Sequence, residues 1–178
     1  VLHEPYGVVL VIAPWNYPFL LLLEPLIGAV SAGNCVLLKP SPFAPTTTGV
    51  IREIVDSVFE PGQVAVFEGD GEVVEELLRE RFDYILFTGG SRFGRHVMEA
   101  AARHLSPVTL ELGGKSPCIV GREADLGIAA RRVGLWMSVD AGQTCIAPDY
   151  VLVHEEQRTA FVEAMKRAIG RFYGDDPY

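Results

Sequence analysis

Short apolar runs alternate with longer amphipathic stretches along most of the chain. The runs are rich in β-branched and aromatic residues, which favour strands, and the stretches repeat their apolar positions with the period of a helix. The pattern predicts strands at Gly7–Ala13, Cys35–Leu38, Val64–Phe67, Tyr84–Phe87, Val108–Leu112, Cys118–Val120 and Tyr150–Val153. It predicts helices at about Leu20–Ala32, Thr48–Phe59, Glu72–Glu80, Arg92–His104, Leu126–Val139 and Glu156–Phe172.

This order of elements indicates an α/β fold with a doubly wound parallel sheet. Strands and helices that alternate through short connections form right-handed βαβ units. The run Val8–Ala13 is apolar at every position, as expected for a strand that is covered on both faces. Ligands of such sheets bind beyond the carboxyl ends of the strands. Polar and glycine-rich segments follow five of the predicted strands, at Pro14–Pro18, Lys39–Ser41, Gly69–Gly71, Thr88–Ser91 and Glu111–Lys115.

Composition and charge narrow the class of protein. The chain has 178 residues, a net charge of −8 and 49% hydrophobic residues, which excludes a disordered chain and argues against a nucleic-acid partner. Three cysteines do not make a disulfide framework in a chain of this length, so we expect a reducing compartment, the cytoplasm. The apolar segment 7–30 contains Pro14, Asn16, Glu24 and Pro25, so we expect a strand, a turn and a helix there rather than a membrane span.

Cys145 is the strongest candidate nucleophile. It lies in Gly142–Pro148, a loop with glycine and proline on either side, where a thiol can be exposed. On residue type alone a lone cysteine is more often structural, and we expect Cys35 and Cys118 to be core residues because they lie in apolar strands. Glu111, at a strand end before two glycines, is the candidate base, and a solvated glutamate without a catalytic role is an equal alternative.

Five short motifs resemble the aldehyde dehydrogenase superfamily and occur in the family's order. They are APWNYP at Ala13–Pro18, LKPS at Leu38–Ser41, FTG at Phe87–Gly89, LELGGKSP at Leu110–Pro117 and GQTCIAP at Gly142–Pro148. The first and last of these, with their flanking residues, most resemble the class 3, fatty-aldehyde-type branch. The resemblance extends from about Pro5 to the end of the chain, and five motifs in order are far more specific than any one of them.

The resemblance implies NAD- or NADP-dependent oxidation of a small-molecule aldehyde to a carboxylic acid. Cys145 would attack the aldehyde as a thiolate, and the side-chain amide of Asn16 with the backbone N–H of Cys145 would stabilise the oxyanion. Hydride transfer to the cofactor would leave a thioester, and Glu111 would activate the water that hydrolyses it. Two alternatives remain open, a Cys145-dependent esterase and a non-catalytic nucleotide-binding fragment.

The resemblance also assigns cofactor contacts. Lys39 and Ser41 match positions that bind the adenosine ribose, and Phe93 falls where the family places an apolar residue against the adenine. Pro42 stands where NAD-selective relatives often have a glutamate, so we expect NADP to be accepted within about an order of magnitude of NAD. The expected contacts are Ile12, Ala13, Pro14, Trp15, Lys39, Ser41, Phe87, Thr88, Gly89, Gly90, Ser91, Phe93, Gly94, Arg95 and Leu112, and no metal is expected.

The resemblance finally predicts the domain organisation. Residues 1–112 would form a Rossmann-like dinucleotide-binding core, and residues 113–178 would begin a second α/β domain, the catalytic domain, which carries the nucleophilic cysteine. Members of the family are much longer. We therefore expect a partial chain that is poorly active by itself, from a full-length protein that assembles as a homodimer or a larger oligomer.

Overall fold

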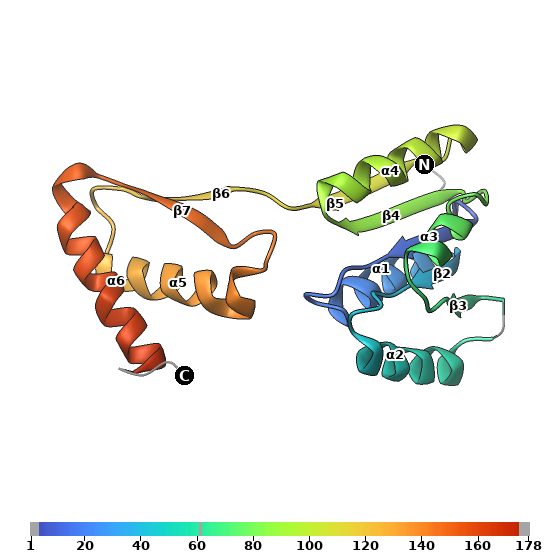
Figure 1. Cartoon of the computed structure of the whole chain (residues 1–178), viewed down its shortest axis with the longest axis horizontal. Coiled ribbons are helices and arrows are strands. Elements are labelled where there is room, and N and C mark those ends of the chain that lie inside the picture. Colours follow the sequence, from blue (N-terminus) through green and yellow to red (C-terminus); the bar gives the residue numbers. More distant parts are fainter. Residues whose placement is uncertain (1–3, 61, 175–178) are drawn as a thin grey trace. The chain divides into compact units, whose positions relative to one another are not determined.

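The computed structural model describes residues 4–60 and 62–174. The chain divides into two compact units, unit 1 at Val1–Leu112 and unit 2 at Gly113–Tyr178. The strands are β1 (Val8–Ile12), β2 (Cys35–Lys39), β3 (Val64–Val66), β4 (Tyr84–Gly89), β5 (Val108–Leu112), β6 (Ser116–Val120) and β7 (Pro148–Val153). The helices are α1 (Leu20–Ser31), α2 (Pro45–Val58), α3 (Gly71–Leu77), α4 (Ser91–His104), α5 (Leu126–Ser138) and α6 (Arg158–Tyr173) (Figure 1).

Unit 1 contains a five-stranded sheet in the order β3-β2-β1-β4-β5, and all neighbouring pairs are parallel. The central strand β1 pairs on one side with β2, where Val9 lies opposite Val36, and on the other side with β4, where Val9 lies opposite Tyr84. The predicted doubly wound parallel sheet is therefore confirmed.

Helices cover both faces of this sheet because successive side chains of a strand point to opposite sides. Leu10 and Ile12 of β1 pack with residues of α3 and α4 in one core. Val9 and Val11 pack with residues of α1 and α2 in the other. Leu10 and Val11 are both completely buried, which explains why the β1 run is apolar without alternation.

Unit 2 is a smaller α/β unit, in which β6 and β7 pair in parallel and α5 and α6 pack together. Val120, Val133 and Phe161 lie in its core. Ile119 of β6 is 75% exposed and Leu152 of β7 is 53% exposed, so this pair of strands presents apolar side chains to solvent within the unit.

The structure differs from the predictions at several places. Cys35 is exposed rather than part of the core, because it is the first residue of β2 and the buried positions begin at Val36. Helix α2 begins at Pro45, three residues before the predicted start, since proline fits the first helical turn. Residues Glu155–Gln157 form a 3₁₀ turn before α6. Cys118 is half-buried and packs against the core of unit 2.

None of the helices within the described residues is both long enough and apolar enough to cross a bilayer. The segment that raised the question forms β1, a turn and α1, as expected.

Candidate active site

The direction of winding in unit 1 changes between β1 and β4. β1 continues through α1 to β2 on one side, and β4 continues through α4 to β5 on the other. Chain segments that leave neighbouring strands in opposite directions open a crevice beyond the carboxyl ends of those strands. The residues after Ile12 and around Gly89 flank this crevice, and both groups contain predicted cofactor contacts.

The turn from β1 to α1 carries Asn16. Ala13 is buried, and its backbone N–H donates to the carbonyl of Lys39 across 3.1 Å. This hydrogen bond attaches the first residue of the turn to the end of β2. Asn16 is half-buried and Trp15 is 45% exposed. An amide side chain held in such a turn has N–H donors of the kind that stabilise an oxyanion.

The amino end of α4 is suited to an anion. Gly90 is its N-cap and provides no side chain to cover the first-turn amides, and the first turn contains no acidic residue. These backbone N–H groups and the helix dipole favour a phosphate. A Cβ on Gly89 would lie 2.5 Å from Cζ of Phe87, so a side chain at this position would collide with the Phe87 ring.

A hollow lies beside this helix end, lined by Glu75, Gly90, Arg92, Phe93 and His96. The Nε2 atom of His96 lies 2.7 Å from the Glu75 carboxylate, and the ring of Phe93 meets the imidazole edge-on at 5.6 Å. Phe93 thus presents an aromatic surface next to the uncapped amides, which fits a nucleotide base beside its phosphates.

Lys39 ends β2 with a side chain that is only 1% exposed. Its Nζ atom donates hydrogen bonds of 2.7 Å to the carbonyls of Pro40 and Gly69. Burial lowers the pKa of Lys39, and the nearby Asp70 carboxylate opposes that shift. Ser41, the next predicted contact, is also buried.

Glu111 is the penultimate residue of β5 and lies opposite Thr88 in the register of β4 and β5. Its side chain is exposed, whereas Thr88 is buried. Helix α4 lies close to the end of β5, since a Cβ on Gly94 would come within 2.8 Å of Cδ2 of Leu112. A rigid strand therefore carries the candidate base to the carboxyl edge of the sheet.

Cys145 lies in unit 2, and its thiol is exposed. Three successive residues shortly before it have left-handed backbone, Asp140 at φ 52°, Ala141 at φ 53° and Gly142 at φ 76°. Residues other than glycine rarely adopt this conformation, and such strain concentrates at functional sites. The sequence pattern gives no sign of this turn apart from Gly142 itself.

Close contacts hold this turn in place. A Cβ on Gly142 would lie 2.9 Å from the carbonyl oxygen of Met137, so the position requires glycine for space as well as for conformation. The Nε2 atom of Gln143 donates to the carbonyl of Asp140 across 2.9 Å. The Cys145 carbonyl oxygen lies 3.8 Å from the Cβ position of Gly114, which places Gly114 next to the Cys145 backbone within unit 2.

The predicted site residues of unit 1 thus gather at the carboxyl edge of its sheet or on the first turns of α4, where Arg95 is exposed. Sequence reasoning missed Glu68 and its ion pair with Arg52, which lie at the same edge. The signal was present, because Glu68 directly precedes the glycine-rich segment after β3. Among the described residues, no group of three or more His, Cys, Asp or Glu side chains could hold a metal ion.

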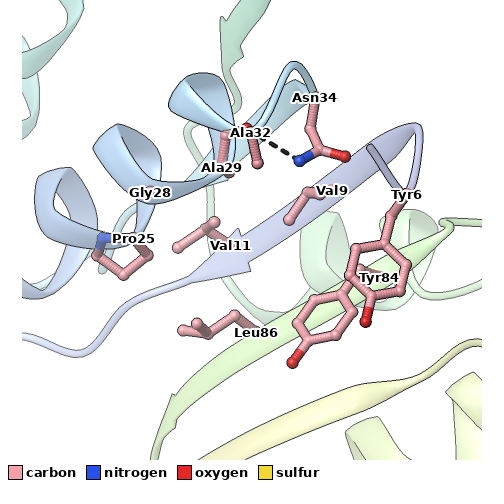
Figure 2. A pocket seen from close by; sticks show the side chains of 10 residues that line it. All are labelled: Tyr6, Val9, Val11, Pro25, Gly28, Ala29, Ala32, Asn34, Tyr84 and Leu86. Atoms are coloured by element: carbon pink, nitrogen blue, oxygen red, sulfur yellow. Dashed lines mark hydrogen bonds between the residues drawn. The ribbon is translucent and has the colours of Figure 1, made fainter. Parts of the chain in front are cut away.

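A further hollow in unit 1 is apolar (Figure 2). Figure 2 shows the rings of Tyr6 and Tyr84 beside each other, and Val9, Val11 and Leu86 line the hollow from the strands next to them. Its one amide side chain is Asn34, which accepts from the N–H of Gly7 and donates to the carbonyl of Ala29. That amide is therefore committed to the backbone, and the other polar side chains that line the hollow are the phenols of Tyr6 and Tyr84.

The model of the aldehyde dehydrogenase family matches residues 1–177. The chain is 50% identical to aldehyde dehydrogenase family 3 member B3 of Mus musculus over 174 residues, which is 98% of this chain and 36% of that protein. It is 47% identical to family 3 member A2 of Rattus norvegicus, over 97% of this chain and 36% of that protein. The chain thus spans little more than a third of the length of these relatives.

Solved structures agree with these matches. The substrate-bound Staphylococcus aureus AldH superposes with a TM-score of 0.93 at 44% identity, over 98% of this chain and 38% of that one. An indole-3-acetaldehyde dehydrogenase of P. syringae in complex with NAD+ superposes with a TM-score of 0.88 at 32% identity, over 96% of this chain and 35% of that one.

Proposed function

Because the chain belongs to the aldehyde dehydrogenase family, we propose that it supplies the cofactor site and the nucleophile of an NAD- or NADP-dependent enzyme that oxidises aldehydes to carboxylic acids. Val1–Leu112 is the dinucleotide-binding core and Gly113–Tyr178 is the first part of the catalytic domain. The observation that carries the proposal is the exposed Cys145 thiol on a loop fixed by three left-handed residues. A structural cysteine does not need such a loop.

The residues at the carboxyl edge fit a nicotinamide dinucleotide. The uncapped amides of α4 suit its pyrophosphate, and the glycine backbone at Gly89 permits a close approach. Phe93 suits the adenine, while Lys39 and Ser41 suit the adenosine ribose. When bound, the cofactor accepts the hydride that leaves the aldehyde carbon. The residues of this chain hold the two reactants, stabilise the oxyanion and accept the proton from water.

Cys145 carries out the first step. Its thiolate forms a bond from sulfur to the aldehyde carbon, and the carbonyl electron pair moves to oxygen as an oxyanion. The Asn16 side-chain N–H and the Cys145 backbone N–H donate to that oxyanion. The sulfur–carbon bond persists when the carbon is oxidised, so the product of this half of the reaction is a thioester on Cys145.

Glu111 carries out the second step as a general base. Its carboxylate takes a proton from water, whose oxygen bonds to the thioester carbon while the carbon–sulfur bond breaks. The carboxylic acid leaves and the Cys145 thiolate is restored. The exposed position of Glu111 at the end of β5 supports this role, because it gives the carboxylate access to water.

The proposal includes the setting in which the enzyme works. We place the protein in the cytoplasm, since the described residues contain three free cysteines, and as a homodimer or larger oligomer in its full length. We expect full activity only from the longer protein that contains this chain, because the chain spans about a third of its relatives.

The test measures reduced cofactor by absorbance when the longer protein is mixed with an aliphatic aldehyde and NAD or NADP. The proposal predicts one equivalent of acid for each reduced cofactor. Cofactor-independent ester hydrolysis without aldehyde oxidation would instead favour the esterase. Rapid turnover by the isolated, monodisperse 178-residue chain would contradict the expectation that this chain is poorly active alone.

A further inference from the structure

A small hollow opens at the carboxyl ends of β2 and β3, beside the start of α2. Its lining includes Pro40, Ser41, Pro42, Thr48 and Glu68. Glu68 is the one ionisable side chain among the residues that line it. The hydroxyl of Thr48 donates to the carbonyl of Ala44 and so is already engaged in its own helix.

The position of this hollow is that of an adenosine ribose. In doubly wound dinucleotide-binding folds, an acidic residue at the end of the second strand accepts hydrogen bonds from the ribose hydroxyls. Here β2 ends at Lys39, and Pro40, Ser41 and Pro42 follow, so the second strand offers no carboxylate. The nearest strand neighbour, β3, brings Glu68 into the same hollow.

The Glu68 carboxylate is held in place by Arg52 of α2. The Nε atom of Arg52 donates to Oε1 of Glu68 across 2.7 Å, and its Nη2 atom donates to the carbonyl of Val66 across 3.1 Å. Both side chains are about half-exposed, at 41% for Arg52 and 49% for Glu68. Arg52 thus lies behind the carboxylate and is not one of the lining residues, which leaves Glu68 to face a ligand.

We propose that Glu68 replaces the missing acid of the second strand, binds the 2′- and 3′-hydroxyls of an adenosine ribose, and disfavours a 2′-phosphate. The inference rests on the proposed dinucleotide function of unit 1. A carboxylate that accepts from the 2′-hydroxyl of NAD meets a second anion when that hydroxyl is phosphorylated in NADP, and repulsion of this kind sets specificity. The proposed role of Glu68 therefore replaces the expectation, drawn from Pro42 alone, that the protein discriminates only weakly between NAD and NADP.

The experiment measures the affinities of NAD and NADP for the 178-residue chain by titration calorimetry at low salt. We expect the wild type to bind NAD more than about 30-fold more tightly than NADP. We expect Glu68→Gln to bring the two affinities within about 5-fold of each other. Glu53→Gln is the matched control, because it removes the same charge from an exposed position on α2, and it should leave the ratio unchanged.

Arg52→Gln separates a positioning role from phosphate recognition. If Arg52 only orients Glu68, this variant narrows the preference for NAD and weakens NAD binding by a few-fold. A selective loss of NADP affinity would make Arg52 a receptor for the 2′-phosphate and would overturn the inference. Added salt should shrink the wild-type preference, since the repulsion between exposed charges is screened.

Two results contradict the inference in distinguishable ways. If both nucleotides bind and Glu68→Gln leaves their ratio unchanged, Glu68 is not the selecting residue, while the dinucleotide site of the proposed function stands. If neither nucleotide binds a chain whose circular dichroism is that of a folded α/β protein, the dinucleotide site fails together with the inference.

Discussion

The Nζ atom of Lys39 donates a hydrogen bond of 2.7 Å to the backbone carbonyl of Gly69, which ties the end of β2 to the segment after β3. Gly69 has φ 140°, and a Cβ there would lie 2.3 Å from Cγ2 of Val73, so the position needs glycine. A buried cation and a glycine turn therefore fix the part of the edge at which Glu68 and Ser41 line a hollow.

The burial of Lys39 predicts a change of stability with pH. Since burial lowers the pKa of Lys39 below 10.5, the unfolded chain holds more protons than the folded chain between the lowered value and 10.5. The contribution of Lys39 to the free energy of unfolding must therefore rise with pH across that window. Urea titrations should show the wild type gaining stability relative to Lys39→Met as the pH approaches 10.5. A difference that stays constant or falls would contradict the burial of the cation.

Gly89 predicts a steric effect at the crevice. Gly89→Ala places a Cβ against the Phe87 ring and should cost about 1–3 kcal/mol of stability, because that buried ring must shift. Gly90→Ala is the control, since no atom lies within 4 Å of its Cβ position, and it should cost less than about 1 kcal/mol. Urea unfolding measures the free energy of unfolding of both variants. Equal losses of stability would contradict close packing at Gly89.

Cys145→Ala should abolish both aldehyde oxidation and ester hydrolysis in the longer protein and leave cofactor affinity nearly unchanged. Cys35→Ala is a demanding control, because the Cys35 thiol is exposed as well. Enzyme assays and cofactor titration check the two effects separately. Loss of activity in the Cys35 variant, with activity retained in the Cys145 variant, would mean that the nucleophile has been assigned to the wrong residue.

Asn16→Ala should lower kcat by about 10²–10³ if its side chain donates to the oxyanion. Steady-state kinetics of the longer protein measure this loss. The interaction is made only when negative charge develops on oxygen, so the fall must appear in kcat. A change confined to KM would reduce Asn16 to a residue that shapes the turn after β1.

The fold was predictable because its signals are local. The apolar runs of β1 and β4 and the helical spacing of α4 place these elements, and a parallel sheet follows from their alternation. The wrong prediction of burial for Cys35 has a different origin, since Cys35 is the first residue of β2 and the buried positions of that strand begin only at Val36. No sequence pattern contains that information.

The candidate site was predictable only in part. Motifs singled out Asn16, Glu111 and Cys145 as candidates because each lies in a short segment of unusual composition. The ion pair of Arg52 with Glu68 joins residues 16 positions apart on different elements, so nothing in the sequence links them. The burial of Lys39 could not be predicted either. Its Nζ atom donates to the carbonyls of Pro40 and Gly69, and the position of Gly69 depends on where β3 ends.

The proposed reaction converts an aldehyde to a thioester on Cys145, and Glu111 then activates the water that hydrolyses this thioester. Mass spectrometry of the Glu111→Gln variant of the longer protein, mixed with an aldehyde and NAD, tests this directly. We expect a stable adduct of the aldehyde's mass less two hydrogen atoms, located on the peptide that contains Cys145 and absent without cofactor. An adduct on Cys35 or Cys118, or steady turnover with no adduct, would contradict it.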